Sequence, residues 1–413
     1  MRCMETFGQA LRRLRQQAGL SQAELSRATK WSQSQISRAE SGNSIPDETT
    51  TRLLDTVLQA GGLLLTLQQH DRRGVLMPPE RAERAPDLVL PIDEPWSVSD
   101  VARRLHRTDV GPQTLEQLRG TVENLCCEYP WRDPATLRGE AKVWLEYTAK
   151  LLDSRVTFRE HRELLVAAGW LTLLIGCLEY DMGLKRPAEI SRNAAFQLGR
   201  ETGHGEIIAW SHELSAWFAL TQDRLRSVPS YARAGQQAAP HASVAVQLAA
   251  QAAKAHARMG DHDQVQKMLD EGFRLLDKHD RPSRPENHFV IDPTKWDFYA
   301  MDCYRLVGEH KKAAEHAHEV IHLAQRPDGT ERSPMRALEA RLTLAIIALR
   351  EGDLEAAQSW TEDALSTDRR SVMSLALLTG EMVSELRQRH DKDPAAAALL
   401  DHLLTARRAL PPA

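Results

Sequence analysis

The sequence predicts an all-α protein that consists of a small N-terminal helical domain and a long array of helix pairs. Ala and Leu are abundant, and alternating runs of β-branched residues are nearly absent, which is typical of helical proteins. At 413 residues the chain is longer than one hydrophobic core usually supports. A glycine followed by an acidic residue recurs in its C-terminal half, which indicates a repeat. We therefore expect two units, a compact one and a repetitive one.

The overall charge and the cysteines limit the function classes. The formal net charge is −4, so any nucleic-acid site must be local. The five cysteines form no C-x-x-C pair and no disulfide framework, which favours reduced thiols and a cytoplasmic location. The N-terminus has no apolar signal segment, and the longest apolar run, residues 164–178, is too short to span a bilayer. We expect that run to be a buried helix and the protein to have no membrane contact.

The chain divides into four segments by pattern. Residues 1–65 read as short helices, and the proline-rich residues 66–95 read as a linker. Residues 96–137 read as connector helices, and residues 138–413 as helical repeats of about six pairs. We therefore predict a small domain that is separated from a large repeat domain.

The stretch LSQAELSRATKWSQSQISRAESG, residues 20–42, contains two helix starts. Ser21 precedes Glu24 by three residues, and Ser32 precedes Gln35 by three. Each combination is a capping box, in which the serine accepts from a backbone N–H and the longer side chain reaches back. Two short helices joined by a tight turn are the expected structure.

A small apolar core accompanies these helices. Helical spacing places Leu25 and Ala28 on one face of the first helix, and Ile36 and Ala39 on one face of the second. Leu11 and Leu14 of the preceding helix are expected to close this core.

The pattern of residues 5 to about 60 resembles the XRE, or Cro/repressor-type, helix-turn-helix family. The resemblance implies that the second helix of the motif enters the major groove of double-stranded DNA, where Gln suits adenine and Arg suits guanine. It implies base contacts first from Gln33, Ser34 and Arg38, and a phosphate contact from Gln22. It also implies an ion pair between Arg15 and Glu40 that braces the motif. The full set of DNA-facing residues is Gln22, Lys30, Ser32, Gln33, Ser34, Gln35, Ser37 and Arg38.

The chain departs from the family at the turn, where Lys30 stands in place of the usual glycine. A positive φ at a residue with a Cβ has a modest cost, but the lysine also places a cation near the phosphates. Residues 1–45 contain seven basic and three acidic residues, a local excess of positive charge. This excess fits an electrostatic DNA footprint that is confined to the N-terminal domain.

The repeat is clearest at Gly260, Gly308 and Gly352, each followed by an acidic residue and an amphipathic segment. Weaker equivalents lie at Gly183, Gln222 and His390, and successive positions are 38 to 48 residues apart. Such spacing is typical of an α-solenoid, in which each helix pair buries its apolar face against its neighbours. The pattern resembles tetratricopeptide (TPR) repeats with longer helices. The longest interval contains the proline-rich segment 279–293.

The first helix of each pair is expected to line the concave surface of the solenoid. Aromatic residues there are mostly core by pattern, but polar neighbours give the groove anchors for a peptide effector or other ligand. The predicted groove residues are Glu213, Trp217, Gln247, Gln251, Lys254, Trp296, Arg305 and Arg341.

No motif for catalysis, a cofactor or a metal is present, so we expect neither an enzyme nor a cofactor. His318 and His322 are one helical turn apart, but a solvated helix face is favoured over a metal site. The basic helix predicted near residues 97–107 is favoured as a connector over a second DNA reader.

The resemblances together imply a dimeric transcriptional regulator of the kind that joins an XRE domain to a TPR-like domain, a group that includes the peptide-responsive quorum-sensing receptors. In this interpretation the TPR-like domain mediates dimerisation and senses a peptide, a small molecule or a protein partner. One alternative is a TPR-type interaction adaptor whose helix-turn-helix is a tether or is not used for DNA. Another is an antitoxin-like repressor that needs no ligand.

Overall fold

The structure is a computed structural model that describes residues 5–42, 44–74, 108–390 and 393–408. Within these residues the chain is helical and has no strand, so the predicted all-α class is confirmed. The chain forms two compact units, residues 1–94 and residues 95–413. We call the described part of the first, residues 5–74, the head, and that of the second, residues 108–408, the body.

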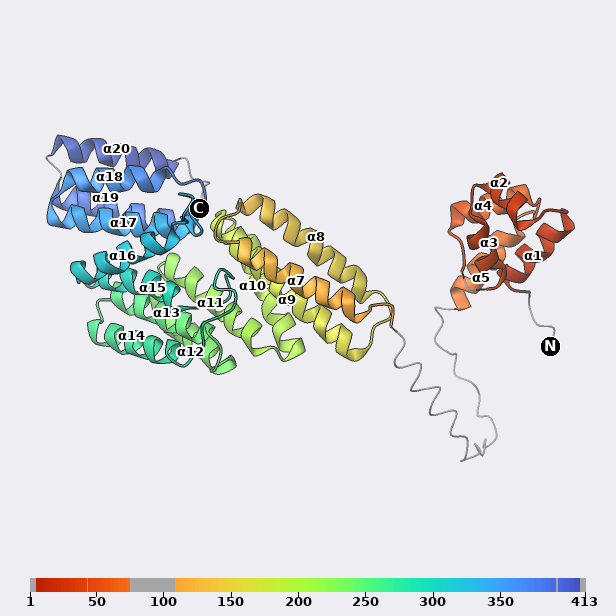
Figure 1. Cartoon of the computed structure of the whole chain (residues 1–413), viewed down its shortest axis with the longest axis horizontal. Helices are drawn as coiled ribbons and strands as arrows, with labels where there is room; N and C mark the ends of the chain where they lie inside the picture. Colours follow the sequence, from red (N-terminus) through yellow and green to blue (C-terminus); the bar gives the residue numbers. More distant parts are fainter. Residues whose placement is uncertain (1–4, 43, 75–107, 391–392, 409–413) are drawn as a thin grey trace, which may run out of the picture. The chain divides into compact units, whose positions relative to one another are not determined.

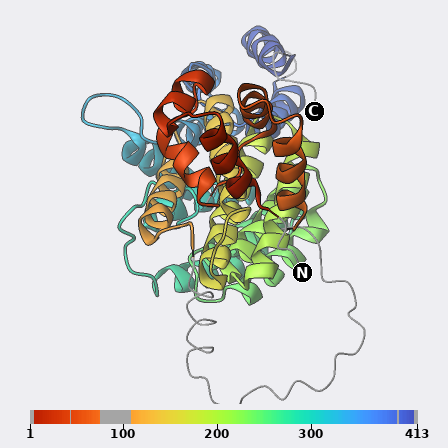
Figure 2. The same ribbon diagram turned by 90° about the vertical axis from the view of Figure 1, so that its right-hand side faces the viewer.

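The head contains five helices. Thr6, Ser21, Ser32 and Asp47 each accept a backbone N–H at the start of a helix, and the first three form complete capping boxes. Both capping boxes predicted within residues 20–42 are therefore present. Figures 1 and 2 show the five helices packed into one small bundle. The helices are α1 (Phe7–Gln17), α2 (Gln22–Thr29), α3 (Gln33–Glu40), α4 (Glu48–Val57) and α5 (Leu63–Gly74).

One apolar core holds these helices together. It contains Leu11, Leu25, Ile36 and Ala39 as expected, together with residues of α4 and α5. The prediction for Ala28 was wrong, because Ala28 is exposed. Thr29 is buried in its place, four residues after Leu25, and its hydroxyl donates to the Leu25 carbonyl at 2.7 Å.

Helices α1 and α3 pack unusually closely. A Cβ at Gly8 of α1 would lie 2.4 Å from the carbonyl oxygen of Ala39. No larger residue fits at that position without a shift of the backbone, so Gly8 fixes the distance between the two helices.

Helix α5 continues to Gly74, past residue 65, where the first domain was predicted to end. The rest of the predicted linker, and residues 96–107 of the predicted connector with its basic helix, lie outside the described residues.

The body is a stack of helix pairs (Figure 1). Each of the six predicted turns lies between the two helices of a pair. The pairs follow an additional one, α7 (Pro112–Glu128) with α8 (Pro134–Leu152). The six are α9 (Phe158–Asp181) with α10 (Lys185–Thr202), α11 (Gly205–Thr221) with α12 (Val228–Ala238), α13 (Val244–Arg258) with α14 (His262–Leu276), α15 (Pro293–Leu306) with α16 (His310–Ala324), α17 (Pro334–Glu351) with α18 (Leu354–Leu365), and α19 (Val372–Arg389) with α20 (Pro394–Arg408).

Left-handed residues mark most of these turns. Gly183, Gly260, Gly308 and Gly352 have φ between 76° and 84°. In the turn predicted at Gln222, the left-handed residue is the following one, Asp223, with φ 58°. A short 3-10 helix, Leu225–Ser227, follows it before α12.

The first helices of the pairs contact one another along the body, and the array closes on itself. Helix α11 contacts α9 and α13, and α15 contacts α13 and α17. Helix α19 belongs to the last of the six pairs. It contacts α17 of the preceding pair, and it also contacts α9 and α11 of the first two pairs. The first helices therefore surround a common interior.

Arg369, in the loop before α19, fastens this closure. Its guanidinium donates to the Asp181 carboxylate at 2.8 Å and to the Tyr129 carbonyl at 3.2 Å. The Tyr129 hydroxyl also donates to Asp181, at 2.7 Å. The end of α7, the end of α9 and the loop before α19 thus meet at one buried carboxylate.

The proline-rich segment between α14 and α15 crosses to the start of the body. Arg284 donates to Asn124 at 2.8 Å, and the backbone of His288 donates to the Cys126 carbonyl at 3.0 Å. The neighbouring Phe289 is buried among aromatic rings of α9 and α11. The insertion therefore forms part of the interior packing.

Helix α9 contains the apolar run predicted to be buried. By length and composition it is the one described helix that could cross a membrane, but 78% of its apolar window is buried inside the protein. It packs against α7, α8, α10, α11 and α19, which is typical of a core helix.

Candidate DNA interface and interior chamber

Helix α3 presents a polar face at the surface of the head. Gln33, Ser34, Ser37 and Arg38 are exposed, whereas Ile36 on the opposite face is fully buried. The capping box at Ser32 fixes the first turn, because Ser32 accepts from the Gln35 backbone and Gln35 accepts from Ser32 in return. The buried face and the capped first turn thus fix the orientation of the exposed polar face.

Arg15 and Glu40 join α1 to α3. Arg15 Nη2 donates to Glu40 Oε2 at 3.0 Å, and Arg15 Nη1 donates to the Leu20 carbonyl at 2.8 Å. Burial alone would raise the pKa of Glu40, but the hydrogen bonds from Arg15 and Gln22 outweigh it and lower that pKa. This contact fixes the end of α3 against α1.

Gln22 takes part in the same contact. Its side-chain nitrogen donates to Glu40 Oε2 at 2.9 Å, so in this structure it holds α2 to α3. One N–H remains to donate to a phosphate or water.

Lys30 ends α2 in the left-handed conformation, with φ 54° and ψ 19°. The positive φ considered from the sequence is therefore present. Lys30 is exposed, and it has no ion pair within the described residues. Arg12, Arg27 and Arg38 are also exposed and have no described ion pair, so the head carries several cations at its surface.

A comparison with protein families agrees with the helix-turn-helix arrangement of the head. A family model described as a helix-turn-helix domain matches residues 6–67. The head is a helix-turn-helix domain. Its motif helices are α2 and α3, and domains of this type occur in DNA-binding regulators. The match covers only the head, and a search of curated proteins found no match for the chain.

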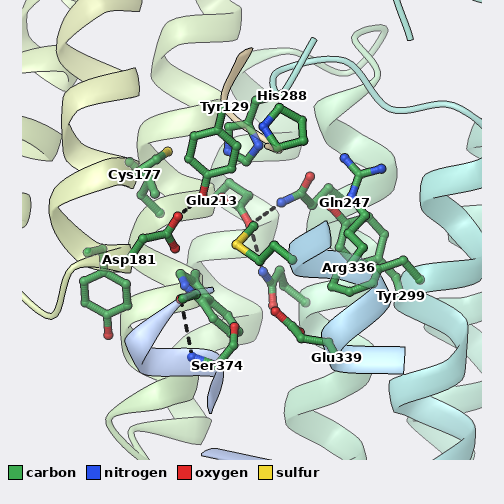
Figure 3. A pocket seen from close by; sticks show the side chains of 18 of the residues that line it. Tyr129, Cys177, Asp181, Glu213, Gln247, His288, Tyr299, Arg336, Glu339 and Ser374 are labelled. Atoms are coloured by element: carbon green, nitrogen blue, oxygen red, sulfur yellow. Dashed lines mark hydrogen bonds between the residues drawn. The ribbon is translucent and has the colours of Figure 1, made fainter. Parts of the chain in front are cut away.

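The body contains an interior chamber of about 100 Å³ (Figure 3). All six first helices, α9, α11, α13, α15, α17 and α19, contribute side chains to it, as do the end of α7 and the proline-rich segment. Of the predicted groove residues, the chamber is lined by Glu213, Trp217, Gln247, Gln251 and Lys254.

The other three predicted groove residues do not line the chamber. Trp296 packs over Gly272 of α14, between two helix pairs. Arg305 is fully buried and pairs with Asp302 and Glu381. Arg341 pairs with Glu331 and Asp363.

Two carboxyl groups of the chamber, Glu213 and Glu339, are compensated only in part, because the charge of Lys254 lowers the pKa of each but burial outweighs it. Glu213 accepts from Gln247 at 2.6 Å and from Gln251 at 2.8 Å, both at the same oxygen, and burial raises its pKa. Burial raises the pKa of Glu339 to about 7, and the charge of Asp302 contributes. Neither carboxyl has an ion pair within the described residues.

The two cations of the chamber differ. Lys254 Nζ lies 2.6 Å from Asp302 Oδ2 and 5.3 Å from the ring centres of Phe298 and Tyr299. Arg336 has no ion pair among the residues that the structure describes, and burial lowers its pKa. Sequence reasoning missed Arg336 and Glu339. The available signal was two charged residues three apart at the start of a first helix that is mostly apolar.

The histidines considered as metal ligands have other neighbours. The His318 ring lies 6.0 Å from Trp360, and His316 Nδ1 lies 2.7 Å from Asp297. In the part of the chain that the structure describes, no group of three or more His, Cys, Asp or Glu side chains is arranged to hold a metal.

Proposed function

We propose that this protein is a sequence-specific DNA-binding transcriptional regulator. The observation that carries the proposal is the exposed face of α3, with Gln33, Ser34 and Arg38 on a helix that is capped at its start and paired through Glu40 to α1. Gln and Arg make bidentate contacts to adenine and guanine in the major groove. The exposed cations of the head would add contacts to phosphates.

We propose further that the body is a TPR-like domain that mediates dimerisation and senses an effector, as in the peptide-responsive quorum-sensing regulators that the sequence resembles. One helix-turn-helix reads few base pairs, so a homodimer that presents two heads to two half-sites would provide the specificity that such a regulator needs. The interior chamber supports a sensing role, because the helices that line it belong to all six pairs. We also propose a cytoplasmic, non-enzymatic protein that uses no cofactor.

Selection of bound sequences from random DNA tests the first proposal. The full-length protein should enrich a motif with two spaced half-sites. The variant Gln33→Ala/Arg38→Ala should lose affinity for that motif by on the order of 100-fold or more, because each bidentate contact contributes roughly 1–3 kcal/mol.

The matched control is Gln16→Ala/Arg52→Ala, which removes the same residue types from exposed positions on α1 and α4. This control should retain the motif. Failure of the unaltered protein to enrich any sequence would reject DNA reading and favour the interaction adaptor.

A further inference from the structure

We propose that the interior chamber binds a small zwitterion of the α-amino acid class, with its ammonium group near Glu213 and Glu339 and its carboxylate near Arg336. The inference rests on the proposed function in one respect, the assignment of effector sensing to the body. The binding site itself follows from the chamber.

The size of the chamber limits the ligand. An engineered cavity of about 150 Å³ holds a molecule the size of benzene. At about 100 Å³ the chamber is smaller than that cavity, so it suits a ligand the size of a small amino acid.

A second pocket of about 430 Å³ adjoins the chamber. Its walls come from the proline-rich segment, α16 and the start of α17, and it shares Ser333 and Arg336 with the chamber. We infer that a ligand enters from this pocket, past Arg336.

One side of the chamber offers acceptors for an ammonium group. Both hydrogen bonds that Glu213 accepts from Gln247 and Gln251 reach the same carboxylate oxygen, Oε1. Gln251 Oε1 is buried without a partner. Glu339, which is 5% exposed, adds a carboxyl without an ion pair. An ammonium group has three N–H donors and one positive charge. It could therefore donate to the oxygens of these three side chains and offset the negative charge of the carboxylates.

The other side offers a cation for a carboxylate. Arg336 lines the chamber and makes no ion pair within the described residues, although the charges of Asp292 and Glu339 partly offset the lowering of its pKa by burial. A guanidinium binds a carboxylate through two parallel hydrogen bonds. Figure 3 shows Arg336, Glu339, Glu213 and Tyr299 around the same space.

The charges of the chamber explain why a zwitterion fits better than an amine or an acid alone. Burial disfavours the charged forms of Glu213, Glu339 and Arg336 alike. A zwitterion would compensate both signs and leave the net charge of the chamber unchanged. The rings of Trp217, Phe298 and Tyr299 supply an apolar wall for the ligand's side chain.

Calorimetric titration of the full-length protein with the L-amino acids tests the inference. The tightest binder is then compared with the amine that lacks its carboxylate and with the acid that lacks its amino group. Each analogue should bind roughly tenfold more weakly or worse, because each loses a charge-assisted contact. Absence of binding by every amino acid at millimolar concentration would overturn the proposal, as would equal affinity for the amine or the acid.

Two variants assign the ends of the ligand. Glu339→Gln should weaken binding of the amino acid and of the amine, and leave binding of the acid unchanged. Arg336→Gln should weaken binding of the amino acid and of the acid, and leave binding of the amine unchanged. Glu319→Gln, at an exposed position on α16, should change nothing. Neither chamber variant breaks an ion pair of the described residues, so each should unfold at no lower urea concentration than the unaltered protein. Equal binding by both chamber variants and the control would contradict the assigned site.

The pH dependence gives an independent readout. Glu339 is surrounded by Lys254 and Asp302, by Asp181 and Ser374, and by Arg336 one helical turn earlier. Its pKa is about 7, so protons compete with the ammonium group near neutrality. Affinity should fall as the pH decreases from 8 to 6, about tenfold per unit once Glu339 is protonated, and this dependence should weaken in Glu339→Gln.

DNA binding is measured in parallel without ligand. DNA selection without amino-acid binding would reject the chamber site and leave the regulator proposal standing. Amino-acid binding without DNA selection would leave the chamber site standing and reject the regulator.

Discussion

In the head, the cations that lack a carboxylate partner lie on the surface, whereas in the body a comparable set of unpaired charges lies inside. Lys30 and Arg38 are exposed on the helix-turn-helix. Arg336 and Glu339 line a chamber to which six helices contribute side chains. A surface cation is solvated and meets a large polyanion without penalty, whereas a buried charge favours a small ligand that compensates it. The location of its uncompensated charge thus distinguishes a unit suited to reading a polymer from a unit suited to enclosing a small molecule.

The largest expected effect comes from the ion pair that closes the body. Arg369→Ala would leave Asp181 buried with only the Tyr129 hydroxyl as a donor, and the two side chains of the pair are only 3% and 6% exposed. Breaking a buried pair from one side costs about 3–5 kcal/mol. Urea unfolding of the full-length protein by far-ultraviolet circular dichroism measures the loss, with exposed Arg370→Ala as the control. A loss below about 1 kcal/mol would mean that closure does not depend on this pair.

A smaller loss is expected from the equivalent pair in the head. In Arg15→Ala, Glu40 keeps its hydrogen bond from Gln22, so the cost should be about 1–3 kcal/mol. Because the folded pKa of Glu40 is lowered, the stabilisation is present at neutral pH and is lost as the pH falls below 4.5, through the folded pKa.

Hydrogen exchange of the intact protein measures this loss locally. Amides of α1 to α3 should exchange faster in Arg15→Ala, and amides of α13 and α17 should not. Equal acceleration in both units would contradict their independence. Arg52→Ala, whose exposed pair with Glu48 lies within α4, serves as the control.

The smallest effect is expected at Lys30. Lys30→Gly relieves a positive φ, so the head should be unchanged or stabilised by up to about 1 kcal/mol, whereas Lys30→Ala retains the strain. Both variants remove one cation, so the slope of log affinity against log salt should decrease by about 0.9 if Lys30 contacts one phosphate. Fluorescence anisotropy with a DNA duplex measures the slope. An unchanged slope would place Lys30 away from the backbone.

The contrast between the units also shows which features the sequence could predict. Capping at Ser21 and Ser32 depends on residues three apart, and both capping boxes were readable for that reason. The error at Ala28 was also local, because a helix of eight residues is too short for its pattern to distinguish a neighbour three residues on from one four residues on.

Long-range features of the body were not readable. Arg369 and Asp181 are 188 positions apart, and no periodicity indicates that the last helix pair returns to the first. Five groove residues line the chamber because they lie on first helices, as the repeat pattern implied. Trp296 and Arg305 also lie on a first helix, but their side chains are occupied by contacts with α14 and α19. Which face of a first helix points inward depends on the closure itself.

The closure between α9 and α19 has a consequence for how this protein can change over evolutionary time. An open solenoid gains or loses repeats freely, since each repeat contacts only its neighbours. Here the duplication or deletion of one helix pair would separate Asp181 from Arg369 and open the chamber. The number of pairs between α9 and α19 is therefore constrained. For the ligand site that we propose, new specificity would arise by substitution within the chamber rather than by lengthening of the array.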